Sequence, residues 1–181
     1  MMKGIFIQMT GLSGAGKSTI GFGVQRTLRE MGYNVEVIDG DEYREGLCKD
    51  LGFSKEDRNT NIRRLSFVGK VLSRNNVICI MSAINPYDDI RKEVLENNSL
   101  AKTVFVDCDL DTLVGRDPKG LYKRALLPDD DPNKIRNFTG ISDPYEKPSN
   151  ADLIINTNEE SVEESIRKLI SFIFKHTHPE D

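Results

Sequence analysis

The residues best suited to chemistry lie in a glycine-rich segment near the start of the sequence. This segment fits the pattern G-x-x-x-x-G-K-[ST] and consists of Gly11, Leu12, Ser13, Gly14, Ala15, Gly16, Lys17, Ser18 and Thr19. In such a loop, backbone N–H groups surround a polyphosphate, the lysine reaches the β- and γ-phosphates, and the hydroxyl after it binds Mg²⁺. The sequence therefore predicts that this loop binds ATP with Mg²⁺, with Lys17 at the phosphates and Ser18 as a metal ligand.

A pair of carboxylates forms the second candidate group. Asp39 and Asp41 follow the apolar segment 35–39, and the carboxyl ends of parallel strands are where open α/β sheets bind ligands. One carboxylate can organise Mg²⁺ and its waters while the other accepts the proton of an attacking hydroxyl. Asp41 also fits a simpler role as a helix cap. We favour catalysis, because capping alone does not require Asp39.

The elements that must position these residues alternate between apolar strands and amphipathic helices. Strands are expected at residues 4–10, 35–39, 77–81, 103–106 and 153–155. Helices are expected at 20–31, 43–52, 54–74, 86–95, 110–116 and from 161 onward. Such alternation predicts an α/β protein with a three-layer P-loop kinase fold, in which about five parallel strands carry helices on both faces.

Residues 117–150 interrupt this alternation. They contain five of the seven prolines and the acidic run Asp129-Asp130-Asp131. A long irregular segment inside a compact domain is usually functional. We therefore expect a lid at about 117–150 within a single domain that spans residues 1–181.

Composition excludes several classes of protein. The balance of 25 basic and 29 acidic residues implies no general affinity for nucleic acid or for an anionic membrane. Cys48, Cys79 and Cys108 form no C-x-x-C pair, which argues against a disulfide framework or a zinc site and for a reducing compartment. The amino terminus does not resemble a signal peptide, and no apolar run approaches the roughly 18 residues of a membrane span. We expect a cytoplasmic protein.

Two other classes of triphosphate-binding protein fit less well than a small-molecule kinase. A GTPase is expected to carry N-K-x-D after a late strand, where this chain has Asn156-Thr157-Asn158-Glu159. An ATP-driven motor usually ends its third strand in an acidic residue, where this chain has Met81-Ser82-Ala83. Asp39 and Asp41 supply the missing acidic function.

Several short motifs follow the loop at characteristic spacing. They are Asp39-Gly40-Asp41, Leu51-Gly52-Phe53, Glu56-Asp57-Arg58, Asn61-Ile62-Arg63-Arg64, Asp117-Pro118-Lys119-Gly120-Leu121-Tyr122-Lys123 and Asn137-Phe138-Thr139-Gly140-Ile141. Over essentially the whole chain this set resembles the adenylyl-sulfate kinase (APS kinase) family of P-loop kinases. The resemblance implies transfer of the ATP γ-phosphoryl group to the 3′-hydroxyl of adenosine 5′-phosphosulfate, giving ADP and PAPS for sulfate assimilation.

The resemblance also assigns roles to single residues. It implies Asp41 as general base, Asp39 in the magnesium shell and Arg116 against the adenine of ATP, with Lys17 completing the catalytic set. The implied acceptor site comprises Asp41, Arg44, Phe53, Arg58, Asn61, Lys119, Lys123 and Phe138. Their chemistry agrees, because aromatic faces stack on a base for roughly 1–3 kcal/mol each and guanidinium groups bind phosphate or sulfate at two points. Phe53 and Phe138 are expected on either side of the acceptor adenine.

Two features depart from the family pattern. In Ile84-Asn85-Pro86-Tyr87 an asparagine replaces a serine that is phosphorylated in some members, so direct in-line transfer is expected; Asp88 replaces an arginine. Segment 126–133 is longer than usual by about five residues, in a loop where insertions are tolerated.

These departures keep other functions open. The alternatives are a kinase of a related substituted nucleotide (a cytidine phosphoramidate, for example), a small-sugar kinase and a non-enzymatic nucleotide-binding protein. Arg63 and Arg64 fit acceptor binding and a solvated helix face equally well. The expected partners are ATP and adenylyl sulfate, with no nucleic acid and no membrane, and family members commonly form homodimers.

Overall fold

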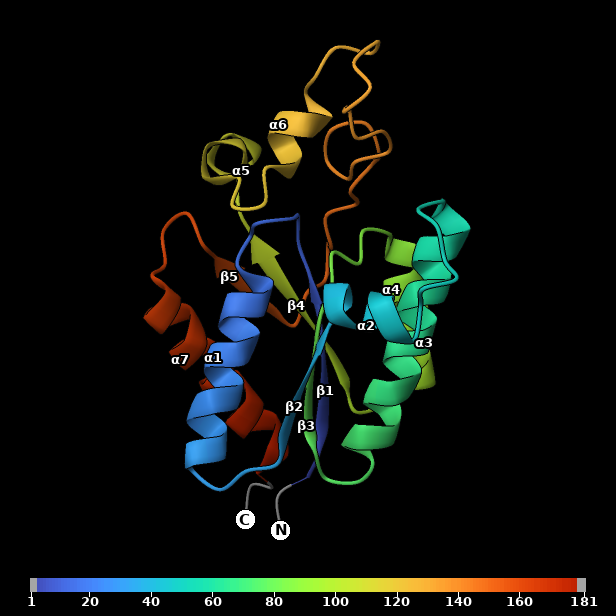
Figure 1. Ribbon diagram of the computed structural model, residues 1–181. Coiled ribbons are helices and arrows are strands. Elements are labelled where there is room, and N and C mark those ends of the chain that lie inside the picture. The colour runs from blue at the N-terminus through green and yellow to red at the C-terminus, as the bar shows by residue number, and fades with distance from the viewer. Residues whose placement is uncertain (1–2, 179–181) are drawn as a thin grey trace.

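A parallel sheet of five strands forms the centre of the computed structural model, which describes residues 3–178 (Figure 1). The strands are β1 (Ile5–Thr10), β2 (Val35–Asp39), β3 (Ile78–Ser82), β4 (Ala101–Asp107) and β5 (Leu153–Asn156), in the order β2-β3-β1-β4-β5. All neighbouring strands pair in parallel. The predicted α/β class is confirmed, and each expected strand lies within two residues of its observed bounds.

Two pairs of helices cover the faces of the sheet (Figure 1). Helices α1 (Lys17–Glu30) and α7 (Val162–Thr177) cover one face, and α3 (Lys55–Ser73) and α4 (Asp88–Asn97) cover the other. None of the helices within residues 3–178 combines the length and apolar character that crossing a lipid bilayer requires.

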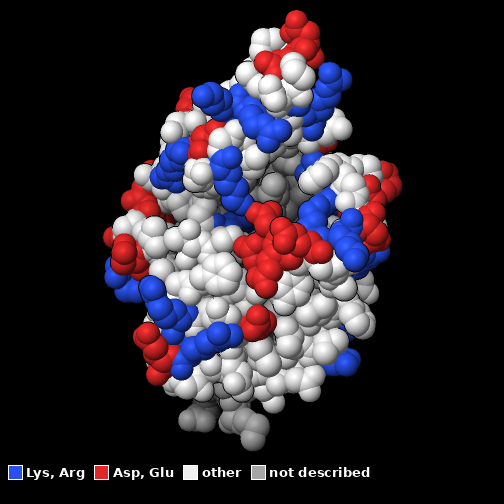
Figure 2. Space-filling view, viewed as in Figure 1, with Lys and Arg blue, Asp and Glu red and all other residues white. Residues whose placement is uncertain are grey.

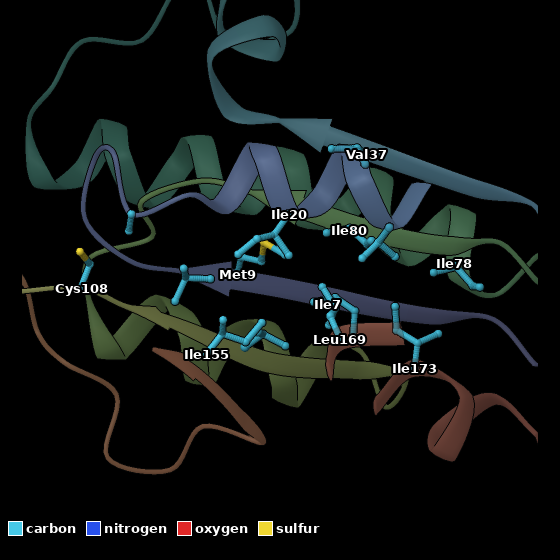
Figure 3. Close-up of a cluster of buried hydrophobic side chains, with 14 of the residues drawn as sticks. Ile7, Met9, Ile20, Val37, Ile78, Ile80, Cys108, Ile155, Leu169 and Ile173 are labelled. Atoms are coloured by element: carbon cyan, nitrogen blue, oxygen red, sulfur yellow. The ribbon is translucent and has the colours of Figure 1, made fainter. Parts of the chain in front are cut away.

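Strand β1 is buried on both faces because each face meets a different core. Ile7 and Met9 belong to the core beneath α1 and α7, where they lie with Ile20 and Leu169 (Figure 3). Phe6 points the other way, into the core beneath α3 and α4. Each fully buried side chain of this size contributes about 1.5–3 kcal/mol. Cys79 and Cys108 are buried in these cores.

Two long helices begin at caps that the sequence identifies. The Ser54 hydroxyl accepts a hydrogen bond from the backbone N–H of Asp57 at 3.1 Å, before α3. Before α7, Ser161 and Glu164 form a reciprocal capping box, with bonds of 3.2 and 2.8 Å. Each cap satisfies N–H groups that have no partner inside the helix.

The region after β2 differs from the prediction. Helix α2 (Gly40–Gly46) begins directly at the end of the strand, not at residue 43. The carboxylate of Asp39 caps it by accepting the backbone N–H groups of Asp41 and Glu42 at 3.0 and 3.4 Å. The alternative in which Asp41 caps this helix is therefore wrong.

Two further helices also differ. Pro86 lies outside α4, which begins at Asp88, because Asn85 takes a left-handed conformation (φ 48°) that turns the chain first. Helix α5 (Leu110–Arg116) has its predicted bounds, but it is followed by α6 (Leu121–Ala125), which the sequence did not indicate. Gly120, with φ 64°, starts α6, and the carboxylate of Asp117 accepts N–H groups of its first turn.

Residues 117–150, called here the cap segment, lie beyond the carboxyl ends of the strands (Figure 1). The strand order reverses beside β1, since β3 and β2 lie on one side of it and β4 and β5 on the other. Ligands of open α/β sheets bind at this reversal. The cap segment therefore covers the edge where the phosphate loop and Asp39 lie.

The packing of α3 on the sheet generates a stability prediction. A Cβ atom at Gly69 would lie 2.2 Å from the buried ring of Phe6, whereas one at Gly115 of α5 would meet nothing within 4 Å. We expect Gly69→Ala to lower the free energy of unfolding by about 1–3 kcal/mol through overpacking. The matched Gly115→Ala should raise it by up to about 1 kcal/mol, because alanine favours helix. Urea denaturation measures both, and equal stabilities would contradict the assigned packing of α3.

Candidate active site

A cavity of about 620 Å³ opens between the sheet edge and the cap segment. Figure 2 shows the surface hollowed there, with acidic side chains gathered over α2 and basic ones on the cap segment above. The predicted residues that line the cavity are Ser13, Gly14, Gly16, Lys17, Ser18, Thr19, Asp39, Asp41, Arg44, Phe53, Arg58, Asn61, Lys119 and Phe138. Most residues predicted separately for donor and acceptor therefore share one cavity.

The phosphate loop connects β1 with α1 and surrounds the side chain of Lys17. Gly14 and Gly16 have φ values of 78° and 100°, which side chains with a Cβ rarely adopt. Gly11 passes so close to β4 that a Cβ atom there would lie 2.4 Å from the carbonyl oxygen of Val106. Only glycine can be accommodated so close to β4, so the conformation of the loop requires glycine at position 11.

Lys17 is buried in this loop. Its Nζ donates hydrogen bonds to the carbonyl oxygens of Gly11 and Leu12, both at 2.8 Å. Burial, and next the nearby charge of Lys119, lower the pKa of Lys17 to about 8, although Asp41 and Asp39 oppose the shift. The ammonium group is thus held close to the cavity at the cost of a weakened preference for the charged form.

Ser18 and Asp39 form an oxygen-rich site beside the loop. The Ser18 hydroxyl donates to Oδ2 of Asp39 at 2.6 Å and lies 2.9 Å from the hydroxyl of Ser82. Mg²⁺ binds hard oxygen ligands and commonly takes one or two carboxylates together with substrate phosphates. The pair therefore fits the predicted metal site. No sequence pattern pointed to Ser82.

Asp41 lines the cavity from the first turn of α2, two residues after Asp39. Its exposed carboxylate forms an ion pair with Lys119 of the cap segment. Both carboxylate oxygens of Asp39 already accept hydrogen bonds, because one caps α2 and the other accepts the hydroxyl of Ser18. Asp41 is therefore the more exposed carboxylate of the pair, and an exposed ion pair is readily exchanged for another partner.

The far end of the cavity carries the predicted acceptor residues. The guanidinium of Arg44 lies 4.3 Å from the ring centroid of Phe53, which is 60% exposed. Asn61 is buried, and its Oδ1 has no hydrogen-bond partner. Phe138 is held edge-on against Tyr122, with ring centroids 5.0 Å apart. Two aromatic rings, a guanidinium and an unsatisfied amide thus surround one space.

Five predicted residues lie outside the cavity lining: Gly11, Leu12, Ala15, Arg116 and Lys123. The first two hold Lys17 through their carbonyl oxygens. The Arg116 guanidinium donates to the carbonyl of Thr157 at 2.8 Å and lies 3.5 Å from the sulfur of Cys108. The binding roles of Arg116 and Lys123 stay predictions.

Arg63 and Arg64 lie on the surface of α3, away from the cavity. Arg63 forms two hydrogen bonds of 2.7 Å to the carboxylate of Glu93, and Arg64 binds Asp50 at 2.5 and 2.8 Å. These ion pairs favour the interpretation of a solvated helix face.

The cavity wall also contains residues that the sequence did not single out for binding. Asn85, whose Nδ2 donates to Gln8 at 3.1 Å, and Arg136 both line it. Tyr122 joins the cap segment to the phosphate loop, since its hydroxyl donates to the carbonyl of Ser13 at 2.9 Å. Of these residues, only Arg136 could have been suspected from the sequence, because it directly precedes the motif that begins with Asn137-Phe138.

Comparisons with known proteins agree with this arrangement. The family model of adenylylsulphate kinase matches residues 3–156. An adenylyl-sulfate kinase of Rippkaea orientalis is 50% identical over 92% of this chain and 90% of its own length. A probable adenylyl-sulfate kinase of Pseudomonas aeruginosa is 48% identical over 92% of this chain and 76% of its own length.

The fold comparison points the same way. The structure of the Mycobacterium tuberculosis APS kinase CysC in complex with AMPPNP and APS superposes with a TM-score of 0.87, at 37% identity, over 96% of this chain and 98% of that one. A sugar kinase from Janibacter shares the fold at a TM-score of 0.64 but only 16% identity. This chain belongs to the adenylyl-sulfate kinase family.

Proposed function

We propose that this protein transfers the γ-phosphoryl group of ATP to the 3′-hydroxyl of adenosine 5′-phosphosulfate, giving PAPS and ADP. One observation carries the proposal: a single cavity joins the Lys17 phosphate loop to a space walled by Phe53 and Phe138, with Asp41 at its rim. The family supports the choice of acceptor, because the structure of the M. tuberculosis relative contains an ATP analogue and APS.

On the donor side, the phosphate loop and Lys17 bind the triphosphate. The ammonium group of Lys17 exchanges carbonyl oxygens for charged phosphate oxygens, which stabilises its charged form. Ser18 and Asp39 would hold Mg²⁺, which neutralises charge on the β- and γ-phosphate oxygens. Arg116, at the end of α5, is expected against the adenine of ATP.

On the acceptor side, Phe53 and Phe138 stack on the adenine while Arg44 and Arg58 face its anionic phosphosulfate. Asn61 offers its unpaired Oδ1 to the same nucleotide. Burying this amide without a partner costs stability, and a bound donor group would restore the missing hydrogen bond. The combination selects a nucleotide over a sugar, because a sugar has no flat face for two rings.

The reaction itself needs one proton transfer. The carboxylate of Asp41 accepts the proton of the 3′-hydroxyl while the hydroxyl oxygen bonds to the γ-phosphorus. The bond between that phosphorus and the oxygen that bridges it to the β-phosphorus breaks, which releases ADP. Lys119 is expected to leave Asp41 and approach the transferred group, with Lys123 beside it. Closure of the cap segment as a lid would exclude water and limit hydrolysis of ATP.

The acidic run of the cap segment does not oppose this acceptor. The side chain of Asp129 is fully exposed and pairs with Lys134 at 2.7 Å, and residues 129–131 do not line the cavity. Their charge therefore points away from the dianionic substrate. We expect the protein in the cytoplasm and as a homodimer, although a hexameric relative from Thiobacillus denitrificans is known, of which this chain covers 29%.

An acceptor screen tests the proposed function. Purified protein with ATP and Mg²⁺ should release ADP in the presence of adenosine 5′-phosphosulfate and form PAPS, because only this acceptor offers both adenine and phosphosulfate to the cavity. Coupled ADP detection and chromatography of the product measure this. ADP release with a cytidine phosphoramidate or a sugar, and none with adenosine 5′-phosphosulfate, would reject the acceptor; ATP binding without release would indicate a non-enzymatic protein.

Replacement of the proposed base gives a second prediction. Asp41→Asn should lower kcat by about 10²–10⁴-fold, because an amide cannot accept the proton, while the Kd for ATP stays close to that of the wild type. Glu42→Gln, the neighbouring acid on α2, is the matched control and should keep full activity. Steady-state kinetics and ATP titration distinguish the two variants, and an active D41N enzyme would remove Asp41 from this role.

The lowered pKa of Lys17 gives a third prediction. Free protein with a Lys17 pKa of about 8 loses this charge as the pH rises through that value. The phosphates of ATP raise the pKa again, so ATP binding should take up more protons at about pH 9 than at about pH 6.5, where Lys17 is already protonated. Calorimetry in buffers of different ionisation enthalpy measures the uptake. Uptake that does not change with pH would contradict the assigned pKa.

A further inference from the structure

The two phenylalanines of the acceptor site come from distant segments that one arginine joins. Nε of Arg58 donates to the carbonyl of Phe53 at 2.9 Å. Its Nη1 donates to the hydroxyl of Thr139 at 2.8 Å, and its Nη2 donates to the carbonyl of Asn137 at 2.7 Å. The same guanidinium therefore binds Phe53 and both neighbours of Phe138.

Asp143 connects this arginine with the turn that carries Phe138. Its Oδ2 lies 3.9 Å from Nε of Arg58. Its backbone N–H donates to the carbonyl of Phe138 at 3.1 Å, and its own carbonyl accepts the N–H of Gly140 at 2.8 Å. A shift of Asp143 would therefore change the positions of both Arg58 and Phe138.

Tyr87 holds the same carboxylate oxygen of Asp143. Its hydroxyl donates to the same Oδ2 at 2.8 Å, and the side chain is 2% exposed at the start of α4. Burial, and next the hydrogen bond to Asp143, raise the pKa of Tyr87 to about 12, so the hydroxyl remains a donor at neutral pH. Neither Tyr87 nor Asp143 lines the cavity.

The two rings differ in how firmly they are held. Phe138 is buried against Tyr122, whereas Phe53 is 60% exposed and has Arg44 and Arg58 over its ring. The gap between the rings therefore depends on where Arg58 is held. An adenine binds more tightly when the separation of the two rings is fixed before it binds, because ordering a wall on binding reduces affinity.

We propose that Tyr87 and Asp143 are positioning residues for the acceptor: they hold Arg58, and Arg58 sets the separation of Phe53 and Phe138. This inference rests on the proposed function, because it assigns these residues to the site of the nucleotide acceptor. It does not extend to Lys17, whose ammonium group is held by carbonyl oxygens within the phosphate loop.

Kinetics with separate donor and acceptor titrations test the inference. Tyr87→Phe should raise the KM for adenosine 5′-phosphosulfate by about five- to tenfold, as expected for one lost hydrogen bond. Asp143→Ala, which also removes the ion pair with Arg58, should raise this KM by at least as much. The KM for ATP and kcat should remain within about twofold of wild type, because the reacting groups are untouched. The double variant should be no worse than Asp143→Ala, since the tyrosine hydroxyl then has no partner to lose.

Tyr33→Phe is the matched control. Tyr33 packs on Phe174 of α7, on the opposite face of the sheet, and its replacement should leave both KM values unchanged. Equal rises of both KM values, or additive effects in the double variant, would show a general structural defect and overturn the positioning role. Inactive wild-type protein would instead overturn the proposed function, and this inference with it.

A direct measurement of acceptor binding tests the positioning role without requiring turnover. The chain contains no tryptophan, so Phe53→Trp introduces a single fluorescent reporter into the acceptor site. Adenosine 5′-phosphosulfate should quench this emission by stacking, and adding Tyr87→Phe should raise the Kd by the same factor as the KM. An unchanged Kd in a folded F53W/Y87F protein would overturn the inference.

Discussion

The site depends on a positive charge that is kept buried at Lys17. An ammonium group out of water is costly, and here two carbonyl oxygens of the phosphate loop compensate for lost hydration. Both carbonyls belong to the loop, and the path of the loop requires Gly11 to pass against β4, where a Cβ atom would collide with the carbonyl oxygen of Val106. Sheet, loop and lysine therefore form one unit, and the polyphosphate adds its charge to a site already shaped for it.

The donor half of the site could be predicted because its signals are local. The glycines, Lys17 and Ser18 lie within one short pattern. The contact between Ser18 and Asp39 joins more distant positions. It was still predictable, since the carboxyl ends of parallel strands meet at one edge of the sheet.

The acceptor half could be predicted only in its residue types. Helix α6, the lining by Arg136 and the bond from Tyr122 to the phosphate loop arise from long-range contacts that leave no periodic pattern. Arg58 illustrates the limit: its motif marks it for the acceptor, but only the fold shows it joined to residues 137 and 139. Likewise, Arg63 and Arg64 share a motif with Asn61, yet their ion pairs turn them to the surface.

The donor and acceptor halves of the site also differ in how firmly their side chains are held, and this difference suits the proposed reaction. Lys17 and Asp39 are fixed by short hydrogen bonds within the sheet edge, so the γ-phosphoryl group meets a prepared surface. Asp41 and Lys119 instead share an exposed ion pair, a kind of contact that contributes little to stability and exchanges readily with water or substrate. In the proposed reaction, Asp41 stays paired with Lys119 until the acceptor binds, and the anionic groups of the acceptor would then draw Lys119 away. With a rigid donor site and an acceptor rim that can exchange its partners, Lys119 can leave Asp41 while Lys17 and Asp39 keep their hydrogen bonds.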